Sequence, residues 1–186
     1  MIDGPVLVHG VPGCGKSTDL RSRYFAVAAS TGWPLVIHDP ALTKAWKDIQ
    51  HVEALGEVTG AAFGRGVHVA FKNPDHVAPL CLAAMKCGRI ILILDELCFV
   101  SNAHVAPKPL IELARTWRNC EVALGMGTQW INDCPTTVVA AVSRLRTGRC
   151  ASPRILEYLR QSYGLDPEVV KALKRGEFLE TILGFH

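Results

Sequence analysis

Residues 10–17 have the sequence Gly-Val-Pro-Gly-Cys-Gly-Lys-Ser, which matches the phosphate-binding pattern G-x-x-x-x-G-K-[ST]. Glycines in such a loop allow backbone torsions that point successive N–H groups at a phosphate. The lysine of the pattern reaches the β- and γ-phosphates of a nucleotide, and the hydroxyl after it binds Mg²⁺. The pattern therefore predicts ATP and Mg²⁺ as cofactors. The predicted nucleotide-binding residues are Gly10, Val11, Pro12, Gly13, Cys14, Gly15, Lys16, Ser17 and Thr18.

Two adjacent acids, Asp95 and Glu96, follow the apolar run 89–94. A carboxylate at the end of a buried strand beside a phosphate loop can hold Mg²⁺, directly or through water. The second carboxylate suits a different task, which is to orient and deprotonate an attacking water. We therefore predict Ser17 and Asp95 as metal ligands, and Lys16 and Glu96 as catalytic residues.

Gln129 follows Thr128 at the end of another apolar run, residues 121–127. If both runs are parallel strands of one sheet, Gln129 and Asp95 emerge at the same sheet edge. An amide there can hydrogen-bond the γ-phosphate or the attacking water, and so sense whether the phosphate is present. Gln129 is therefore a further predicted catalytic residue.

These residues need a strand before the phosphate loop and a helix after it. Apolar runs without polar alternation predict buried parallel strands, and the helical patterns between them predict covering helices. The expected fold is α/β, a three-layer RecA/ASCE-like P-loop NTPase with a mostly parallel central sheet. The predicted strands are 5–9, 33–38, 67–71, 89–94, 121–127, 143–149 and 177–183. The predicted helices are 17–29, 41–51, 75–87 and 109–119, then two more that begin at Ser152-Pro153 and Asp166-Pro167 and stop at Gly164 and Gly176.

Length and composition predict one domain over residues 1–186, with residues 151–186 as a helical and strand extension of it. Half of the residues are apolar, but charges interrupt the longest apolar stretch, so we expect no membrane span. The N-terminus has no signal-peptide pattern, which predicts a cytoplasmic protein. The seven cysteines are odd in number and form no C-x-x-C pair. They predict reduced, buried thiols rather than disulfides or a zinc site.

The net charge of +3 is uneven along the chain. Residues 141–176 carry eight Lys and Arg against three Asp and Glu, whereas residues 1–140 are balanced. A basic segment of this kind can face nucleic acid. Charge alone fits solvated helix faces equally well.

Residues 118–129 resemble a motif of the FtsK–HerA superfamily of DNA-pumping ATPases. The motif consists of an Arg, a short turn, an apolar strand and Thr-Gln. The order of the other motifs is similar too, including the closing Leu-x-x-Gly-Glu-Phe-Leu at 173–179, so the resemblance spans about residues 5–183. The small size is similar to the viral genome-packaging branch. Asn119 in place of the usual His, and glycines at 125 and 127, depart from the pattern.

This resemblance implies a ring, a hexamer, with double-stranded DNA threaded through its centre and ATP sites shared between neighbours. It also implies a capsid or portal-vertex protein as partner, and a location in the host cytoplasm or at the packaging vertex. Lys72 and Lys108 are candidate pore residues. Arg118 is the predicted arginine finger that acts on the neighbour's ATP, with Arg115 and Arg146 as alternatives.

Three other functions remain open at this stage. A superfamily 1 viral helicase has a similar phosphate loop, but it needs a second RecA-like domain for which 186 residues leave no room. A nucleotide or nucleoside kinase transfers phosphate to a bound acceptor and has no use for a water-activating Glu96. An ATP-gated assembly or secretion module binds ATP and turns it over very slowly.

Overall fold

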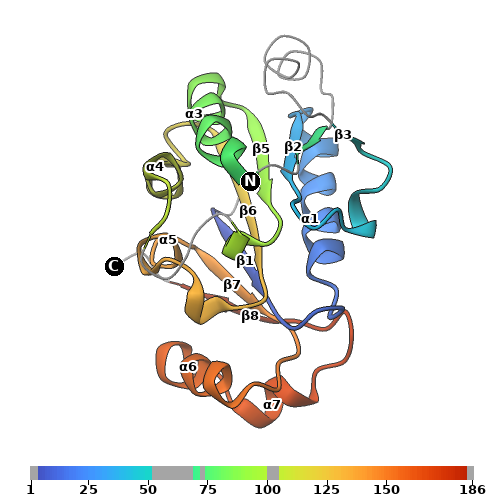
Figure 1. Cartoon of the computed structure of the whole chain (residues 1–186), viewed down its shortest axis with the longest axis vertical. Coiled ribbons are helices and arrows are strands. Elements are labelled where there is room, and N and C mark those ends of the chain that lie inside the picture. Colours follow the sequence, from blue (N-terminus) through green and yellow to red (C-terminus); the bar gives the residue numbers. More distant parts are fainter. Residues whose placement is uncertain (1–3, 52–68, 72–73, 100–104, 184–186) are drawn as a thin grey trace.

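The computed structural model describes residues 4–51, 69–71, 74–99 and 105–183. Within these ranges, one sheet runs through the molecule, with α1 on one face and α3, α4 and α5 on the other (Figure 1). The three-layer α/β fold with a mostly parallel sheet is confirmed. No helix in the described ranges combines the length and apolar character needed to cross a bilayer.

The described sheet has the strand order β3-β4-β2-β5-β6-β1-β7-β8. Every neighbouring pair is parallel except β7 and β8, which are antiparallel. Parallel strands have all their carboxyl ends at one edge, so the loops after β1, β2, β5 and β6 meet there. The strands are β1 (Val6–His9), β2 (Leu35–His38), β3 (Gln50–His51), β4 (Val69–Phe71), β5 (Ile90–Leu94), β6 (Val122–Thr128), β7 (Arg144–Thr147) and β8 (Leu179–Ile182).

The helices connect these strands and cover the sheet. The α-helices are α1 (Lys16–Thr31), α3 (Val77–Cys87), α4 (Lys108–Thr116), α5 (Thr136–Val139), α6 (Pro153–Tyr163) and α7 (Pro167–Ala172). Short 3₁₀ helices occupy Lys44–Trp46, Pro74–His76, Leu97–Phe99 and Ile131–Asp133. α7 starts as predicted, because the Asp166 carboxylate accepts a hydrogen bond of 2.9 Å from the Glu168 N–H.

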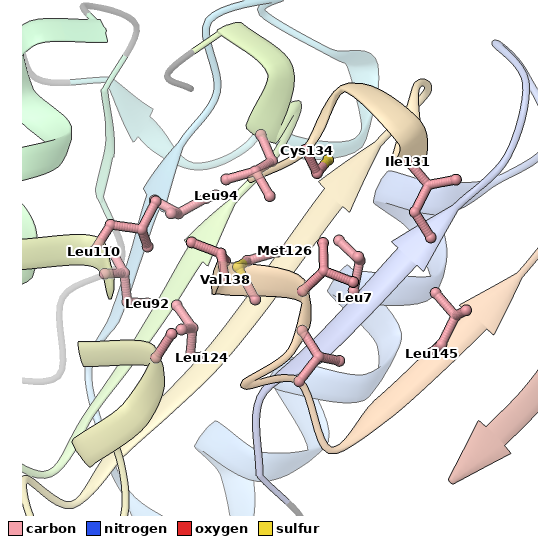
Figure 2. Packing of buried hydrophobic residues seen from close by; sticks show 14 of the residues in the cluster. Leu7, Leu92, Leu94, Leu110, Leu124, Met126, Ile131, Cys134, Val138 and Leu145 are labelled. Carbon is pink, nitrogen blue, oxygen red and sulfur yellow. The ribbon is translucent and has the colours of Figure 1, made fainter. Parts of the chain in front are cut away.

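The apolar strands are buried on both faces, which explains why their sequences do not alternate with polar residues. In β5, Ile91 and Ile93 pack with α1, whereas Leu92 and Leu94 pack with α3 and α4. Figure 2 shows the second of these cores, with Leu92 and Leu94 beside other large apolar residues. All seven cysteines are free thiols, and Cys14 is one of those that are buried.

The predicted helix over residues 41–51 is wrong. Only Lys44–Trp46 forms a helical turn, and Gln50–His51 is the short strand β3. The Asp39 carboxylate accepts a hydrogen bond of 2.7 Å from the Thr43 N–H, and this local side-chain contact competes with helix formation. Leu42 also adopts a positive φ of 49°, which a helix cannot contain.

Gly176 does not end a helix, contrary to the sequence prediction. α7 already ends at Ala172, and Gly176, with φ 86°, lies in a turn between α7 and β8. In Figure 1 this red turn lies beside the blue loop between β1 and α1. The first two residues of the predicted strand 67–71, and the candidate pore residue Lys72, lie outside the described residues.

Two glycines in β6, which depart from the family pattern, make room for other side chains. A Cβ at Gly125 would lie 2.4 Å from the Tyr24 ring, and one at Gly127 would lie 2.8 Å from Asp95 Oδ1. Tyr24 cannot easily move away, because its hydroxyl donates a 2.7 Å hydrogen bond to the Leu124 carbonyl oxygen. Glycine is therefore required at both positions, because the Tyr24 ring on α1 and the Asp95 carboxylate after β5 approach β6 there.

Gly125→Ala is expected to lower the free energy of unfolding by about 1–3 kcal/mol, because it overpacks this contact. Urea unfolding measures the change. In a Tyr24→Ala background the same substitution should lose most of its effect, since the ring it meets is gone. An equal loss of stability in both backgrounds would contradict this account.

Candidate nucleotide-binding and catalytic site

The phosphate loop joins β1 to α1 and is held from two sides. The Val11 N–H donates to the Arg149 carbonyl oxygen at 3.0 Å, and the Cys14 carbonyl oxygen accepts from the Gly176 N–H at 2.8 Å. Gly13 and Gly15 have φ of 77° and 108°, values that residues with a Cβ rarely adopt. The loop is thus fixed in shape at the N-terminus of α1, whose dipole favours an anion.

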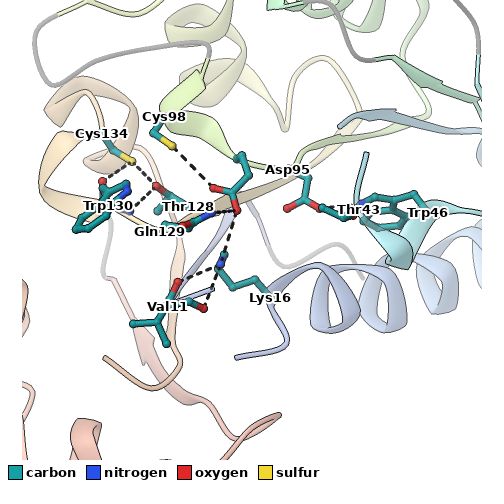
Figure 3. A network of polar contacts seen from close by, with 12 residues as sticks. Val11, Lys16, Thr43, Trp46, Asp95, Cys98, Thr128, Gln129, Trp130 and Cys134 are labelled. Carbon is teal, nitrogen blue, oxygen red and sulfur yellow. Dashed lines mark hydrogen bonds and ion pairs between the residues drawn. The ribbon is translucent and has the colours of Figure 1, made fainter. Parts of the chain in front are cut away.

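Lys16, Glu96 and Gln129 meet at the carboxyl edge of the sheet. Figure 3 shows Lys16 and Gln129 within this network of polar contacts. Lys16 Nζ donates to the Gly10 carbonyl oxygen at 3.0 Å and lies 3.7 Å from Glu96 Oε1. Gln129 Nε2 donates to the same Glu96 oxygen at 2.8 Å. Lys16 and Gln129, from separate elements, therefore converge on the buried Glu96 carboxylate.

Glu96 has a positive φ of 73°, although it is not a glycine. A non-glycine residue in this region costs about 1–3 kcal/mol and persists only where its surroundings enforce it. The contacts with Lys16 and Gln129, together with Cys98 Sγ at 3.8 Å from Glu96 Oε2, supply that enforcement. The backbone geometry turns the Glu96 carboxylate toward the phosphate loop.

Asp95 is fully buried and contacts the segment after β2. Its Oδ2 accepts a 2.7 Å hydrogen bond from Trp46 Nε1, and Thr43 Oγ1 lies 3.5 Å away. Its Oδ1 has no hydrogen-bond partner within the described parts of the chain. Burial raises the pKa of Asp95, and the Ser17 hydroxyl partly offsets that rise. A hydroxyl and a carboxylate of this kind are oxygen ligands that suit Mg²⁺.

Burial raises the pKa of Asp95 to about 6, and the nearby carboxylates of Asp39 and Glu96 add to the rise. Without metal, the folded protein therefore binds this proton more tightly than the unfolded chain does. Its stability should fall as pH rises from about 4 to about 6, and the loss is complete above that range.

Asp95→Asn is expected to raise the unfolding free energy of the metal-free protein by up to about 3 kcal/mol at pH 8. The asparagine oxygen can still accept from Trp46, and no charge is buried. At pH 4 the gain should be far smaller. Thermal unfolding in EDTA at both pH values measures it, and an equal gain at both would contradict the cause assigned here.

A cavity of about 320 Å³ opens above these residues. Sequence reasoning missed several residues that line it, because they come from the segment after β2 and from the turn after α7. The Asp39-Pro40 end of β2 was a usable signal for the first segment, whereas nothing in the sequence pointed to Arg175. The lining residues are Pro12, Gly13, Gly15, Lys16, Ser17, Thr18, Ala41, Thr43, Lys44, Ala45, Glu96, Gln129 and Arg175.

The three candidate arginine fingers differ in their surroundings. Arg118 lies in the turn between α4 and β6, at the amino edge of the sheet, with its guanidinium 5.1 Å from the Trp117 ring. Arg115 is exposed on α4. Arg146 is held within the chain by ion pairs with Asp19 at 2.7 Å and Glu180 at 2.6 Å, which leaves it poorly placed to act as a finger.

The chain matches a protein-family model. Residues 6–100 match the model described as "Viral superfamily 1 RNA helicase core domain", which covers just over half of the chain. The matched residues run from β1 through the phosphate loop to the segment after Glu96. Comparison with curated proteins gave no significant relative.

The fold is similar to several solved structures. The genome packaging NTPase B204 from Sulfolobus turreted icosahedral virus 2, in complex with ATP-gammaS, aligns with a TM-score of 0.80 at 20% identity, covering 98% of this chain and 93% of that one. B204 of Sulfolobus turreted icosahedral virus, described as the DNA-packaging ATPase, aligns with a TM-score of 0.77 at 19% identity over 98% and 94% of the two chains.

A more distant likeness is to the cytoplasmic domain of the Type VII secretion ATPase EccC of Thermomonospora curvata. Its TM-score is 0.54 at 16% identity, over 77% of this chain and 19% of that one. The alignments with B204 cover 98% of this chain, so the similarity in fold extends beyond the residues that the family model matches. The chain therefore belongs to the viral superfamily 1 RNA helicase core domain family, and its fold is similar to that of B204.

Proposed function

We propose that this protein is an Mg²⁺-dependent ATPase that works as a ring-shaped motor and packages double-stranded viral DNA into a preformed capsid. The observation that carries the ATPase is the convergence of Lys16, Gln129 and Glu96 beside the phosphate loop. A buried glutamate in that position suits the activation of water better than the transfer of phosphate to an acceptor.

Lys16 would change partners when a nucleotide binds. In the structure, its ammonium group contacts the Gly10 carbonyl oxygen and Glu96 Oε1. The phosphates of ATP offer a stronger anionic partner, and Lys16 would turn from Glu96 to the β- and γ-phosphates. This exchange frees Glu96 to accept a proton from water, which couples nucleotide binding to activation of the base.

Ser17 and Asp95 would hold the metal, and Mg²⁺ supplies charge that stabilises the transferring phosphoryl group when bound. Glu96 orients the attacking water and takes its proton. Gln129, now hydrogen-bonded to Glu96 Oε1 at 2.8 Å, can donate instead to the γ-phosphate or the water. The position of the Gln129 side chain, at the end of β6, would therefore depend on whether a γ-phosphate is present.

The DNA and ring parts of the proposal rest on other support. B204, the fold neighbour across nearly the whole chain, is described as a DNA-packaging ATPase. A ring would place the same basic loops of every subunit around one pore. A protein with a net charge of only +3 per monomer could then bind the phosphates of DNA through the combined charge of these loops. Lys108, exposed at the start of α4, is the candidate pore residue within the described chain. Partners would then include a capsid or portal-vertex protein, and the site of action would be the host cytoplasm or the packaging vertex.

One experiment tests the main points together. ATP hydrolysis is measured with and without double-stranded DNA at low salt, alongside the mass of the protein in ATP. We expect a hexamer-sized species whose hydrolysis rises with DNA of any sequence and falls with added salt. ADP formed only with a small acceptor would indicate a kinase, and ATP binding without turnover would indicate an assembly module.

The family match favours a second candidate function, the unwinding of duplex nucleic acid by a superfamily 1 helicase. A strand-displacement assay with RNA and DNA duplexes separates the two. A packaging motor moves along double-stranded DNA without separating its strands, whereas a helicase releases one labelled strand. ATP-dependent release of a strand would replace the packaging proposal.

A further inference from the structure

The turn that follows α7 forms a wall of the nucleotide site. The Gly176 N–H donates to the Cys14 carbonyl oxygen at 2.8 Å, so the turn is tied directly to the phosphate loop. The turn is closed on itself, because the Lys174 N–H donates to a Glu177 carboxylate oxygen at 2.7 Å. Residues more than 150 positions apart in the sequence thus form one surface.

Phe178, directly after this turn, is anchored in the same place. A Cβ at Gly148 would lie 2.9 Å from its ring, so the ring fits only because that residue is glycine. The Arg146 guanidinium lies 5.4 Å from the ring centroid, and it also binds Asp19 on α1 at 2.7 Å. The position of the turn is therefore set by α1 and β7, and the negative charge of Asp19 is neutralised.

A second cavity, of about 430 Å³, lies between this turn and the start of α1. It is lined by Ser22, Asp19, Gly176 and Phe178, and it shares Gly15, Thr18 and Arg175 with the phosphate cavity. Arg175 therefore stands where the two cavities meet. Its exposed guanidinium has no hydrogen bond or ion pair with the described residues.

We propose that the second cavity holds the base and ribose of the bound nucleotide, and that Arg175 binds the α-phosphate within the same subunit. In ATP the α-phosphate lies between the ribose and the β- and γ-phosphates. Arg175 has the matching position, between the second cavity and the phosphate cavity. The volume lies within the ~300–1,000 Å³ typical of ligand sites, and Phe178 supplies an aromatic wall for a base. This inference rests on the proposed ATPase function.

Two substitutions separate the base from the phosphates. Ser22→Trp places a large side chain in the second cavity, and Ala26→Trp places the same side chain one helical turn further along α1, outside it. Arg175→Ala removes the cation, and Arg154→Ala is its control, since Arg154 is 80% exposed on α6. Binding of ATP and of inorganic tripolyphosphate to each protein is measured by calorimetry.

Ser22→Trp is expected to weaken ATP binding by tenfold or more and to leave tripolyphosphate binding unchanged. Arg175→Ala is expected to weaken both ligands by about tenfold, the worth of a charge-assisted hydrogen bond. Both controls should bind like the wild type. Two results for Ser22→Trp would overturn the assignment of the base to the second cavity. One is normal binding of ATP, and the other is an equal loss of affinity for ATP and tripolyphosphate.

The two proposals can fail separately. If the wild type hydrolyses ATP with DNA but neither Ser22→Trp nor Arg175→Ala alters binding, only the base cavity and the Arg175 role are wrong. If ATP binds with the expected pattern of losses but no variant or condition gives hydrolysis, the motor function is wrong and the cavity assignment stands. A wild type that binds no ATP overturns both.

Discussion

Replacing Glu96 by glutamine is expected to slow ATP hydrolysis by about 10²–10⁴-fold while ATP still binds. The substitution keeps the size of the side chain and its contact with the Gln129 amide, but it removes the group that accepts a proton from water. It also removes the negative partner of Lys16, which lies 3.7 Å from the ammonium group, so ATP affinity should stay equal or rise. Single-turnover kinetics measure the hydrolysis rate, and equilibrium binding measures the affinity for ATP.

Lys16→Ala provides the contrast for this prediction. It removes the cation that the phosphates need, so both binding and hydrolysis should be lost. Glu112→Gln, on the exposed face of α4, is a control that should change neither. A Glu96→Gln protein that hydrolyses ATP at the wild-type rate would show that Glu96 is not the base.

Arg118→Ala is expected to slow hydrolysis in the assembled ring by about 10³-fold or more while each subunit binds ATP normally. Arg118 cannot act on the ATP of its own subunit. It precedes β6 at the amino edge of the sheet, and the length of β6, about 20 Å, separates it from Gln129. In the proposed ring, the arginine would therefore act on the ATP of a neighbouring subunit.

Mixed rings test this arrangement. Arg118→Ala subunits keep an intact phosphate loop, and Lys16→Ala subunits keep Arg118, so a ring of both contains complete shared sites and should regain activity. Arg89→Ala is the control, because Arg89 is an exposed arginine at the same amino edge and pairs with Glu121 at 3.3 Å. Full activity in rings of Arg118→Ala alone would place the finger elsewhere, with Arg115 next to be tested.

Local sequence patterns were enough to predict the nucleotide loop and the sheet edge at which the other site residues emerge. A G-x-x-x-x-G-K-[ST] pattern between a strand and a helix leaves few other structures. Uninterrupted apolar runs such as 90–94 indicate strands buried on both sides, which parallel sheets require. In a parallel sheet, residues that follow different strands meet at one edge, so Asp95, Glu96 and Gln129 could be placed together from their order alone.

The residues that complete this edge became visible only from contacts between distant parts of the chain. Residues 41–51 have a helical composition, but the hydrogen bonds of Asp39 with Thr43, and of Trp46 with Asp95, hold the segment against the site instead. Gly176 resembles a helix stop in the sequence, yet its N–H binds the phosphate loop.

These outcomes depend on contacts between residues far apart in the chain, and no local propensity encodes them. The same holds for Gly125 and Gly127, whose role is visible only when Tyr24 and Asp95 lie against β6. Local pattern determined which elements form, because hydrophobic periodicity and backbone torsions act over a few residues. The packing of those elements determined which side chains share the nucleotide site, because that depends on the one arrangement that buries both faces of the sheet.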